Sequence, residues 1–564
     1  MTHPGEQFYP EGVHWDDPLA RGTLPDLLSK AAAEFAARPA IEFRDRAIGY
    51  TELEALVEVA AAAYLRAGYG RNTSVAVFLG NSPDHPVNFF GALKAGARIV
   101  HLSPLDGERA LSHKLSDSGA RILVTSDLAA LLPTALKFLE KGLLDRLIVC
   151  EDDHWGAVGN PHAPIPDHPA IVRVATFVQG AARPAQWPQI SPDDTALLQY
   201  TGGTTGLPKG AMLSHGNLTS AVSIYDVWSR KARLERNAIE RVICVLPLFH
   251  IFALTVVMLF SIRRGNLISL HQRFDVEAVM RDIEVKRATA FPGVPTMWIA
   301  IAGLPDLDKR DFSSLVSCGS GGAPLPVEVA RILERKTNMK LKSGWGMTET
   351  CSPGTGHPEA GPDKPGSIGL MLPGIEMDVV ALDDPRNVLS SGEVGEIRIR
   401  GPNVTNGYWN RPQETTEAFV GDRFLTCDIG YIDNDGYFYL VDRKKDMIIS
   451  GGFNVYPQMI EQAIYEHPAV QEVVVIGIAD DYRGEAAKAF VKLRAGANPF
   501  SLDELKAFLA GKLGKHEIPA ALDFVDELPR TPVGKLSRHE LRNLQSTPHP
   551  AQPRQQHLAT GGRS

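Results

Sequence analysis

Cysteine is scarce in this sequence, with five residues among 564. No two of them have the spacing of a zinc knuckle or of a C-x-x-C redox pair, and a sparse, odd number is typical of free thiols in a reducing compartment. The first residues, MTHPGEQFYPEGVHWDDP, are polar and lack the apolar core of a secretory signal. We therefore expect a cytoplasmic protein. The cysteines are Cys150, Cys244, Cys318, Cys351 and Cys427.

An excess of positive charge is also missing. Lys and Arg number 58 against 66 Asp and Glu, which gives a formal net charge of −8. This balance argues against a nucleic-acid binder, whose surface normally carries a basic excess. Apolar residues make up 44% and charged residues 22%, values that exclude a disordered, collagenous or coiled-coil chain. At roughly 150 residues per domain, the length predicts about two to four domains.

One long run without formal charge spans the 21 residues 242–262, between Arg241 and Arg263. Its length alone would allow a membrane span. Pro247 and His250 lie in its first half, however, and only 12 residues separate His250 from Arg263. The run therefore predicts a buried strand, a turn and a core helix.

Short apolar strands alternate with helices through most of the chain, which predicts βαβ units and a largely parallel sheet. Residues 153–192 are rich in Pro and His and indicate a surface connection. A strand that runs into a Gly-rich turn is expected at 314–326, and Pro324 or Pro326 can open the helix that follows. The other expected strands are 74–79, 121–126, 146–152, 195–200, 241–246 and 288–294, with helices at 51–67 and 85–95.

The pattern changes after about residue 366. Alternating strands at 392–401 and 436–443, joined by Gly, Asn and Asp turns, predict a small antiparallel subdomain. Beyond Arg443, helices at 459–466 and 502–513 with strands at 470–478, 486–494 and 521–525 predict a compact α+β unit. The expected fold class is α/β: a large N-terminal domain (1–442) with stacked, mainly parallel sheets, helices and the β-rich subdomain, a small α+β C-terminal domain (443–545) and a disordered tail (546–564).

The segment with the most specific chemistry is YTGGTTGLPKGAMLSHGNL, residues 200–218. A strand feeds a loop of Thr and Gly that ends at Lys209, and a helix is expected to start near His215. Glycines let backbone N–H groups surround phosphate oxygens, Thr hydroxyls add donors, and lysine supplies a positive charge. Gly210 follows Lys209 where a P-loop NTPase has Ser or Thr. The loop therefore predicts a phosphate site of another class.

This loop resembles that of the adenylate-forming enzymes, the superfamily of acyl-CoA synthetases, luciferases and peptide-synthetase adenylation domains. Four more stretches agree in order: SGGAPLP (320–326), GWGMTET (344–350), LTCDIGYID (425–433) with VDRKKDMIISGGFNVYP (441–457), and PRTPVGKLSRHEL (529–541). The resemblance covers roughly residues 20–545. TGGTTG and PLFHIFALT (247–255) are most similar to long-chain-type fatty acyl-CoA synthetases, and a narrower likeness is to bacterial pimeloyl-CoA ligases.

The resemblance implies that a carboxylic acid attacks the α-phosphate of ATP to give an acyl-adenylate, and that coenzyme A then displaces AMP. It makes Glu349 the Mg²⁺ ligand, which suits a hard cation, and Thr348 an α-phosphate contact. SGGAPLP would hold adenine. The implied nucleotide-binding residues are Thr201, Gly202, Gly203, Thr204, Thr205, Gly206, Lys209, Gly321, Gly322, Ala323, Trp345 and Gly346.

Asp428 matches the carboxylate that holds the ribose hydroxyls, and Arg443 would also reach the ribose. Cys427 stands where the family usually has Gly; we interpret it as a buried small thiol rather than a catalytic one. Lys445 matches the hinge of a mobile C-terminal domain. Lys535, in PVGK, resembles the lysine that reaches the carboxylate and α-phosphate during adenylation. Acetylation of Lys535 by a lysine acetyltransferase would remove its charge.

Gly451 and Gly452 resemble the turn that lines the pantetheine tunnel, and Asn454 belongs to the same stretch. His250 is either a gate of the acyl pocket or a satisfied core histidine. The expected pocket lining, Phe249, Val294, Gly319, Gly344 and Met347, suits an alkyl chain.

We therefore predict an ATP- and CoA-dependent ligase of medium-to-long-chain acids, with dicarboxylic acids among the candidate substrates. The alternatives are an acyl-AMP ligase that loads a carrier protein and a non-catalytic ATP- or lipid-binding relative. No anchor or basic amphipathic helix is visible, so membrane contact would be peripheral.

Overall fold

A computed structural model describes residues 3–546 except 45, 202–207, 231–238, 324, 359–360, 363, 481 and 532–534. Contacts within the chain divide it into two units. The first comprises Met1–Met447 with Pro532–Lys535, and the second Ile448–Thr531 with Leu536–Ser564. Our boundary after Asp442 stays a prediction, because a division by contacts does not define an independently folding domain. The predicted tail, apart from Ser546, lies outside the described residues.

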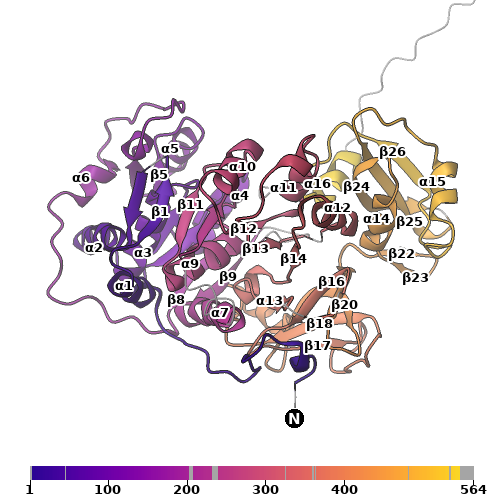
Figure 1. Ribbon diagram of the computed structural model, residues 1–564. Helices are drawn as coiled ribbons and strands as arrows, with labels where there is room; N and C mark the ends of the chain where they lie inside the picture. Colours follow the sequence, from indigo (N-terminus) through magenta and orange to yellow (C-terminus); the bar gives the residue numbers. More distant parts are fainter. Residues whose placement is uncertain are drawn as a thin grey trace, which may run out of the picture. The chain divides into compact units, whose positions relative to one another are not determined.

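The first sheet of the first unit has seven strands in the order β7-β6-β5-β3-β4-β8-β9 (Figure 1). Neighbouring strands within this sheet are parallel, except for β8 and β9, which form an antiparallel pair. The strands are β3 (Ser74–Val77), β4 (Arg98–His101), β5 (Ile122–Ser126), β6 (Arg146–Cys150), β7 (Ile171–Arg173), β8 (Thr195–Thr201) and β9 (Lys209–Ser214). The helices in this region are α2 (Tyr50–Arg66), α3 (Asp84–Lys94), α4 (Glu108–Ser118), α5 (Leu132–Glu140) and α6 (Val174–Val178).

Residues 153–192 are mostly exposed, which agrees with the predicted surface connection, but they also include regular structure that the sequence did not predict. They contain most of a short 3₁₀ helix, η2 (Asp152–Trp155), as well as α6 and the strand β7, which pairs with β6 at the edge of the sheet. The physical reason is the apolar stretch IVRVATFV within this segment. Phe177 of α6 is buried in the core, so the stretch contributes to packing although its surroundings are rich in Pro and His.

The second sheet has the order β14-β13-β12-β10-β11-β1-β2 and is parallel except between β1 and β2. Its strands are β1 (Pro39–Phe43), β2 (Arg46–Gly49), β10 (Arg241–Cys244), β11 (Leu267–Leu270), β12 (Ala290–Gly293), β13 (Ser317–Ser320) and β14 (Lys342–Ser343). The helices are α1 (Leu24–Glu34), α7 (His215–Trp228), η3 (Ala253–Leu259), α9 (Phe260–Arg264), α10 (Val276–Glu284), α11 (Pro295–Ala302), η4 (Leu307–Lys309) and α12 (Val327–Thr337).

The uncharged run 242–262 folds as the sequence predicts. It begins in β10, turns at Pro247–His250 and continues as a buried helix whose segment η3 is a π-helix, followed by α9. Among the described residues, no helix combines the length and the apolar character needed to cross a membrane. Pro326 immediately precedes α12, as expected.

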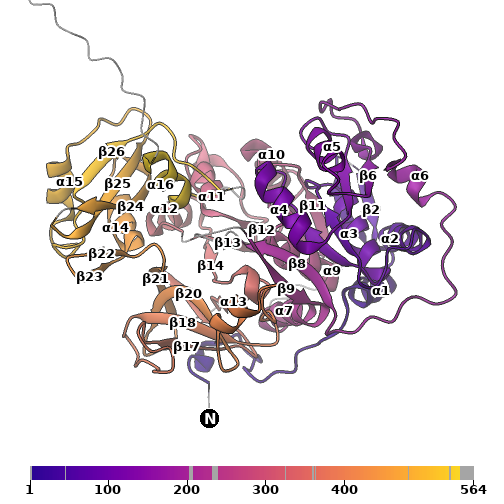
Figure 2. The same cartoon turned by 180° about the vertical axis from the view of Figure 1, so that it is seen from behind.

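The third sheet is antiparallel, as predicted for this part of the chain, and has the order β15-β16-β21-β20-β18-β17, with β19 paired to β20 (Figure 2). An N-terminal segment lies against it, since the Trp15 indole N–H donates to the Ile375 carbonyl (2.7 Å). The elements are η1 (Glu6–Phe8), η5 (Thr348–Thr350), β15 (Thr355–Gly356), β16 (Ser367–Met371), β17 (Glu376–Val380), β18 (Gly395–Arg400), α13 (Pro412–Glu417), β19 (Phe419–Val420), β20 (Arg423–Ile432) and β21 (Phe438–Arg443).

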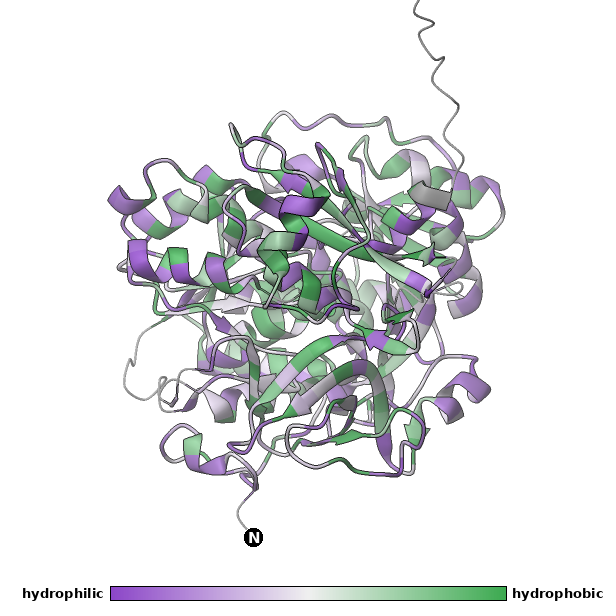
Figure 3. Cartoon of the chain, turned by 90° about the vertical axis from the view of Figure 1, so that its right-hand side faces the viewer, coloured by the Kyte–Doolittle hydropathy of each residue, from purple (hydrophilic) through white to green (hydrophobic). Residues whose placement is uncertain are grey.

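The second unit has its own sheet and apolar core. Its strands are β22 (Ile448–Ser450), β23 (Phe453–Val455), β24 (Val470–Asp480), β25 (Gly484–Leu493) and β26 (Ala521–Phe524). Helices α14 (Pro457–Tyr465) and α15 (Leu502–Leu509) bury Ile460, Ile464 and Leu505 against the sheet, and α16 spans Arg538–Ser546. Figure 3 shows hydrophobic residues concentrated along the strands of the sheets. The α/β fold class is confirmed.

Candidate active site

The phosphate-loop segment forms a hairpin. Thr201 at the end of β8 pairs with Lys209 at the start of β9, so the expected succession of strand, loop and helix is corrected to strand, loop, strand and helix. The physical reason is that KGAMLS can pair along its whole length with β8. Ser214 then caps α7 and accepts a hydrogen bond from the Asn217 N–H (3.0 Å). The predicted phosphate contacts Gly202, Gly203, Thr204, Thr205 and Gly206 lie outside the described residues.

Residues 402–409, which we call the bridging segment, lie against β9. The Met212 N–H donates to the Gly407 carbonyl (2.9 Å), and the Trp409 N–H donates to the Gly210 carbonyl (2.8 Å). The buried Asn217 amide donates to the Pro402 and Val404 carbonyls (3.0 and 2.9 Å). Our sequence analysis missed this segment, although the Gly and aromatic residues of NGYWN were a signal for it.

Glu349, the predicted Mg²⁺ ligand, lies in η5 and is only 5% exposed. The Tyr408 hydroxyl donates to its Oε1 (2.9 Å), and the Thr405 N–H donates to its backbone carbonyl (2.7 Å). Burial raises the pKa of the Glu349 carboxyl. A bound cation would reverse this effect, because it favours the charged form. Thr348, the preceding residue, is half-buried.

Gly346 is required by the tight loop that carries Glu349. A Cβ atom at this position would lie 1.3 Å from the Ser352 carbonyl oxygen, so no other residue fits this backbone. The buried Asn403 side chain fixes the same loop, because its amide donates to the Thr350 and Pro353 carbonyls (2.7 and 2.8 Å). The bridging segment therefore contacts both β9 and the Glu349 loop.

Asp428, the predicted ribose ligand, is completely buried on β20. The Trp345 indole N–H donates to its Oδ2 (2.7 Å), and Nε of Arg443, its register partner on β21, lies 2.8 Å from Oδ1. Within the described residues, Oδ1 accepts no aligned hydrogen bond. The structure thus brings Trp345, Asp428 and Arg443 together and leaves a buried acceptor that a ribose hydroxyl can satisfy.

Cys427 is exposed, so the interpretation of this residue as a buried thiol is wrong. The alternation of β20 explains the difference: Phe424, Thr426 and Asp428 face inward, which leaves Cys427 on the opposite face. Its φ of +58° lies in the left-handed region, which glycine adopts at no steric cost. The family's usual Gly at this position therefore has a backbone reason.

The predicted adenine loop follows β13, and two of its glycines are closely packed. A Cβ at Gly321 would lie 2.8 Å from the Phe252 ring, and one at Gly322, whose φ is +81°, would lie 2.8 Å from Lys535 Cε. Ala323 is half-buried. Lys535 belongs to the first unit, and burial together with the Arg443 charge lowers its pKa to about 8. The predicted catalytic lysine is thus half-buried beside this loop.

His250 is half-buried, and its Nδ1 accepts a hydrogen bond from the Phe252 N–H (3.3 Å) at the start of the helix that contains η3. Burial and the positive charge of Lys535 lower the pKa of His250 to about 3, so the ring is neutral at physiological pH. The satisfied Nδ1 agrees with a core histidine, whereas the partial exposure agrees with a gate. Both readings stay predictions.

The remaining predicted residues are the proposed hinge, Lys445, and three residues at the hairpin of β22 and β23. Lys445 is exposed. Gly451 and Gly452 form the two-residue turn between β22 and β23, with φ values of +58° and +83°, the combination that such hairpins require. Asn454 is exposed on β23. Their roles toward coenzyme A stay predictions.

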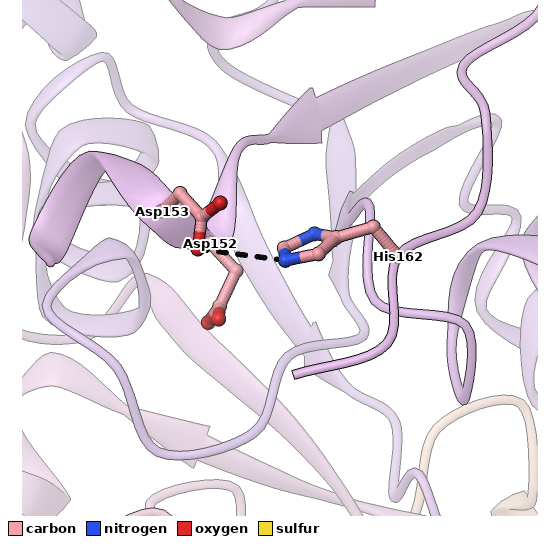
Figure 4. Close-up of side chains that lie close together, drawn as sticks. All are labelled: Asp152, Asp153 and His162. Carbon is pink, nitrogen blue, oxygen red and sulfur yellow. Dashed lines mark ion pairs between the residues drawn. The ribbon is translucent and has the colours of Figure 1, made fainter. Parts of the chain in front are cut away.

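A separate cluster of ionisable side chains, Asp152, Asp153 and His162, was not predicted (Figure 4). Arg44 pairs with the buried Asp152 carboxylate (2.7 Å). His162 lies 3.4 Å from Asp153 Oδ1 and 3.2 Å from Asp127 Oδ2. Because a guanidinium already neutralises Asp152, we interpret the cluster as an ion-pair network that fixes the segment after β6.

Two family descriptions match the chain: AMP-binding enzyme over residues 28–409 and AMP-binding enzyme C-terminal domain over residues 459–535. The chain therefore belongs to the AMP-binding enzyme family, whose members include AMP-forming acyl-CoA synthetases, and the predicted superfamily is confirmed. Among individual proteins, it is 36% identical over 557 residues to the long-chain-fatty-acid–CoA ligase of Bacillus subtilis (strain 168), covering 96% of this chain and 98% of the relative. It is also 36% identical over 514 residues to a feruloyl-CoA synthase of Amycolatopsis sp., covering 89% and 95%.

Solved structures agree with the fold. ATP-bound MatB from Rhodopseudomonas palustris superposes with a TM-score of 0.81 at 29% identity, covering 92% of this chain and 98% of that one. The o-succinylbenzoate coenzyme A synthetase of Bacillus subtilis, in complex with ATP and magnesium ion, gives 0.75 at 28% identity, covering 92% and 99%.

Proposed function

We propose that this protein activates a medium-to-long-chain fatty acid to its acyl-CoA through an acyl-adenylate, releasing AMP and pyrophosphate. The observation that carries the proposal is the 36% identity to a long-chain-fatty-acid–CoA ligase over almost the full length of both chains. The described site supports it, because Glu349, Asp428, Arg443 and Lys535 are all retained in the first unit. A non-catalytic relative would be expected to have lost some of these groups.

The residues fit ATP and Mg²⁺. The buried Asp428 Oδ1 can accept a ribose hydroxyl, and the buried Glu349 carboxylate is a suitable Mg²⁺ ligand. Bound Mg²⁺ would neutralise phosphate charge. Lys209 would bind phosphate oxygens. The protonated Lys535 ammonium would reach the carboxylate and stabilise the charge that grows on the α-phosphate during adenylation. Coenzyme A, the second cosubstrate, would then accept the acyl group. We propose that four residues serve this step: Lys445, Gly451, Gly452 and Asn454.

Three alternatives make different predictions. A carrier-protein ligase would form the adenylate without consuming coenzyme A. A pimeloyl-CoA ligase would prefer dicarboxylates. The identity to a feruloyl-CoA synthase favours an aromatic acid as a second candidate substrate. We further propose a cytoplasmic location with at most peripheral membrane contact. Acetylation of Lys535 remains a hypothesis, and the half-burial of this lysine would limit access to it.

The test is loss of the free coenzyme A thiol with Mg-ATP and C2–C18 monocarboxylates, dicarboxylates and ferulate. Thiol loss that peaks among monocarboxylates of C7 or longer supports the proposal. Lys535→Met should slow it about 10²–10³-fold, while the surface variant Lys340→Met should not. A peak with dicarboxylates or ferulate would replace the proposed substrate. Pyrophosphate release without thiol loss would indicate carrier-protein loading.

A further inference from the structure

Tyr408 lies between the two groups expected to hold the triphosphate and its metal. Its hydroxyl donates to Glu349 Oε1 (2.9 Å), and its ring centroid lies 5.4 Å from Nζ of Lys209. Tyr408 is separated from Glu349 by 59 residues and comes from the bridging segment, so a third part of the chain connects β9 with the Glu349 loop.

We propose that Tyr408 is a positioning residue of the metal–phosphate site. Its hydroxyl orients the Glu349 carboxylate toward Mg²⁺, and its ring holds the Lys209 ammonium near the phosphates. The inference rests on the proposed function, because it presupposes that the site binds Mg-ATP.

The backbone places Tyr408 independently of any ligand. An isolated bridge pairs it with Ala211 of β9, and its N–H donates to Thr415 Oγ1 (2.9 Å). Gly407, just before it, has φ of +122°, and a Cβ there would lie 2.3 Å from Thr415 Cγ2. Only glycine fits this close approach, so the backbone just before Tyr408 is held against Thr415.

The chemistry of the two contacts explains why a tyrosine suits this position. A carboxylate has two oxygens, and a hydrogen bond to Oε1 fixes the direction in which the group faces a metal ion. Hydrogen bonds of this kind to metal-ligating carboxylates typically change metal affinity about 10–100-fold. The face of the aromatic ring attracts the Lys209 ammonium through its quadrupole. Phenylalanine would keep the second contact and lose the first, so the two roles are separable.

The experiment uses the full-length protein and Mn²⁺ as a spectroscopic probe of the metal site. Binding of Mn²⁺ to the ATP complex is followed by electron paramagnetic resonance, and binding of metal-free ATP by calorimetry. Tyr408→Phe should weaken Mn²⁺ binding about 10-fold and leave metal-free ATP binding unchanged. Tyr408→Leu should weaken both, because Lys209 then also loses its support.

Two comparisons separate positioning from stability. Tyr50→Phe removes a buried hydroxyl that donates to the Asn266 and Ser261 carbonyls (2.8 and 3.1 Å), so it should lower thermal stability without changing Mn²⁺ affinity. Glu349→Gln should weaken Mn²⁺ binding by itself, and adding Tyr408→Phe to it should weaken binding no further.

Wild-type Mn²⁺ affinity in Tyr408→Phe, or a second independent loss in the double variant, would overturn the inference. The proposed substrate is judged separately: a wild-type protein that binds ATP and Mn²⁺ but forms no fatty acyl-CoA contradicts the proposed function and leaves this test intact.

Discussion

The lowered pKa of Lys535 predicts that adenylation fails in mildly alkaline solution. The proposed role of this residue needs a protonated ammonium, and burial with the nearby Arg443 charge lowers its pKa to about 8. Because the protonated form is the active one, the rate should be full well below pH 8 and should fall as the pH rises through that value. An unperturbed lysine would keep its charge to about pH 10.

The expected size of the fall in rate follows from the fraction of protein in which Lys535 stays protonated. With a pKa of about 8, roughly 90% of the protein carries the charge at pH 7 and roughly 10% at pH 9. The rate should therefore fall about tenfold between these values. Arginine stays charged across this range, so Lys535→Arg should be slower but should lose the alkaline decline. Removal of the charge by Lys535→Met should cost about 10²–10³ in rate.

The assay is acid-dependent pyrophosphate–ATP exchange, which reports adenylation without coenzyme A. The value of kcat/KM for ATP is compared between pH 6.5 and 9.5, because this ratio reports groups of the free enzyme. Lys340→Arg, a change at an exposed lysine, controls for general effects of the substitution. A decline that begins only near pH 10, or one that persists unchanged in Lys535→Arg, would refute the assignment.

Three further predictions concern other residues. Gly346→Ala should reduce exchange at least about 10²-fold, because its Cβ would overlap the Ser352 carbonyl, whereas Gly107→Ala, where nothing lies within 4 Å, should be neutral. Burial raises the pKa of Asp84 to about 7, so the folded state binds this proton more tightly than the unfolded state does. The contribution of this proton to the free energy of unfolding is fully present below about pH 4 and is lost as the pH rises through about 7. Urea unfolding should therefore show Asp84→Asn gaining up to about 3 kcal/mol over wild type between pH 5 and 8, and a constant difference would contradict this. Of the five cysteines only Cys427 is exposed, so one thiol should react in the native protein and none in Cys427→Ser.

The parallel core could be predicted from the sequence because its strands are buried on both faces. Runs such as RILVTS and RLIVC are therefore continuously apolar, and β5 and β6 are found there. The uncharged run 242–262 was predictable because Pro247 interrupts it. That Asp428 and Arg443 belong to one site was expected only through the resemblance, and their pairing in register was not predicted, since nothing in the local pattern places them opposite each other.

The features that escaped prediction depend on contacts with another segment, which is adjacent in the sequence for β9 and distant for Tyr408. The strand β9 forms because β8 lies beside it, and Tyr408 meets Glu349 across 59 residues. The exposure of Cys427 could have been predicted, because it follows from counting alternate positions in β20 from the buried Phe424. Composition misled us there, since cysteine is commonly buried.

Two buried amides explain why the site geometry is tied to the assembly of the whole first unit. Asn217 donates to the Pro402 and Val404 carbonyls, and Asn403 donates to the Thr350 and Pro353 carbonyls. Each amide thus supplies two donors to backbone acceptors on another segment. An aspartate of the same shape would place acceptors against acceptors, and a buried unpaired carbonyl costs about 1–3 kcal/mol. Because one amide fixes the bridging segment to α7 and the other fixes it to the Glu349 loop, the contact between Tyr408 and Glu349 depends on both of these hydrogen-bonded junctions.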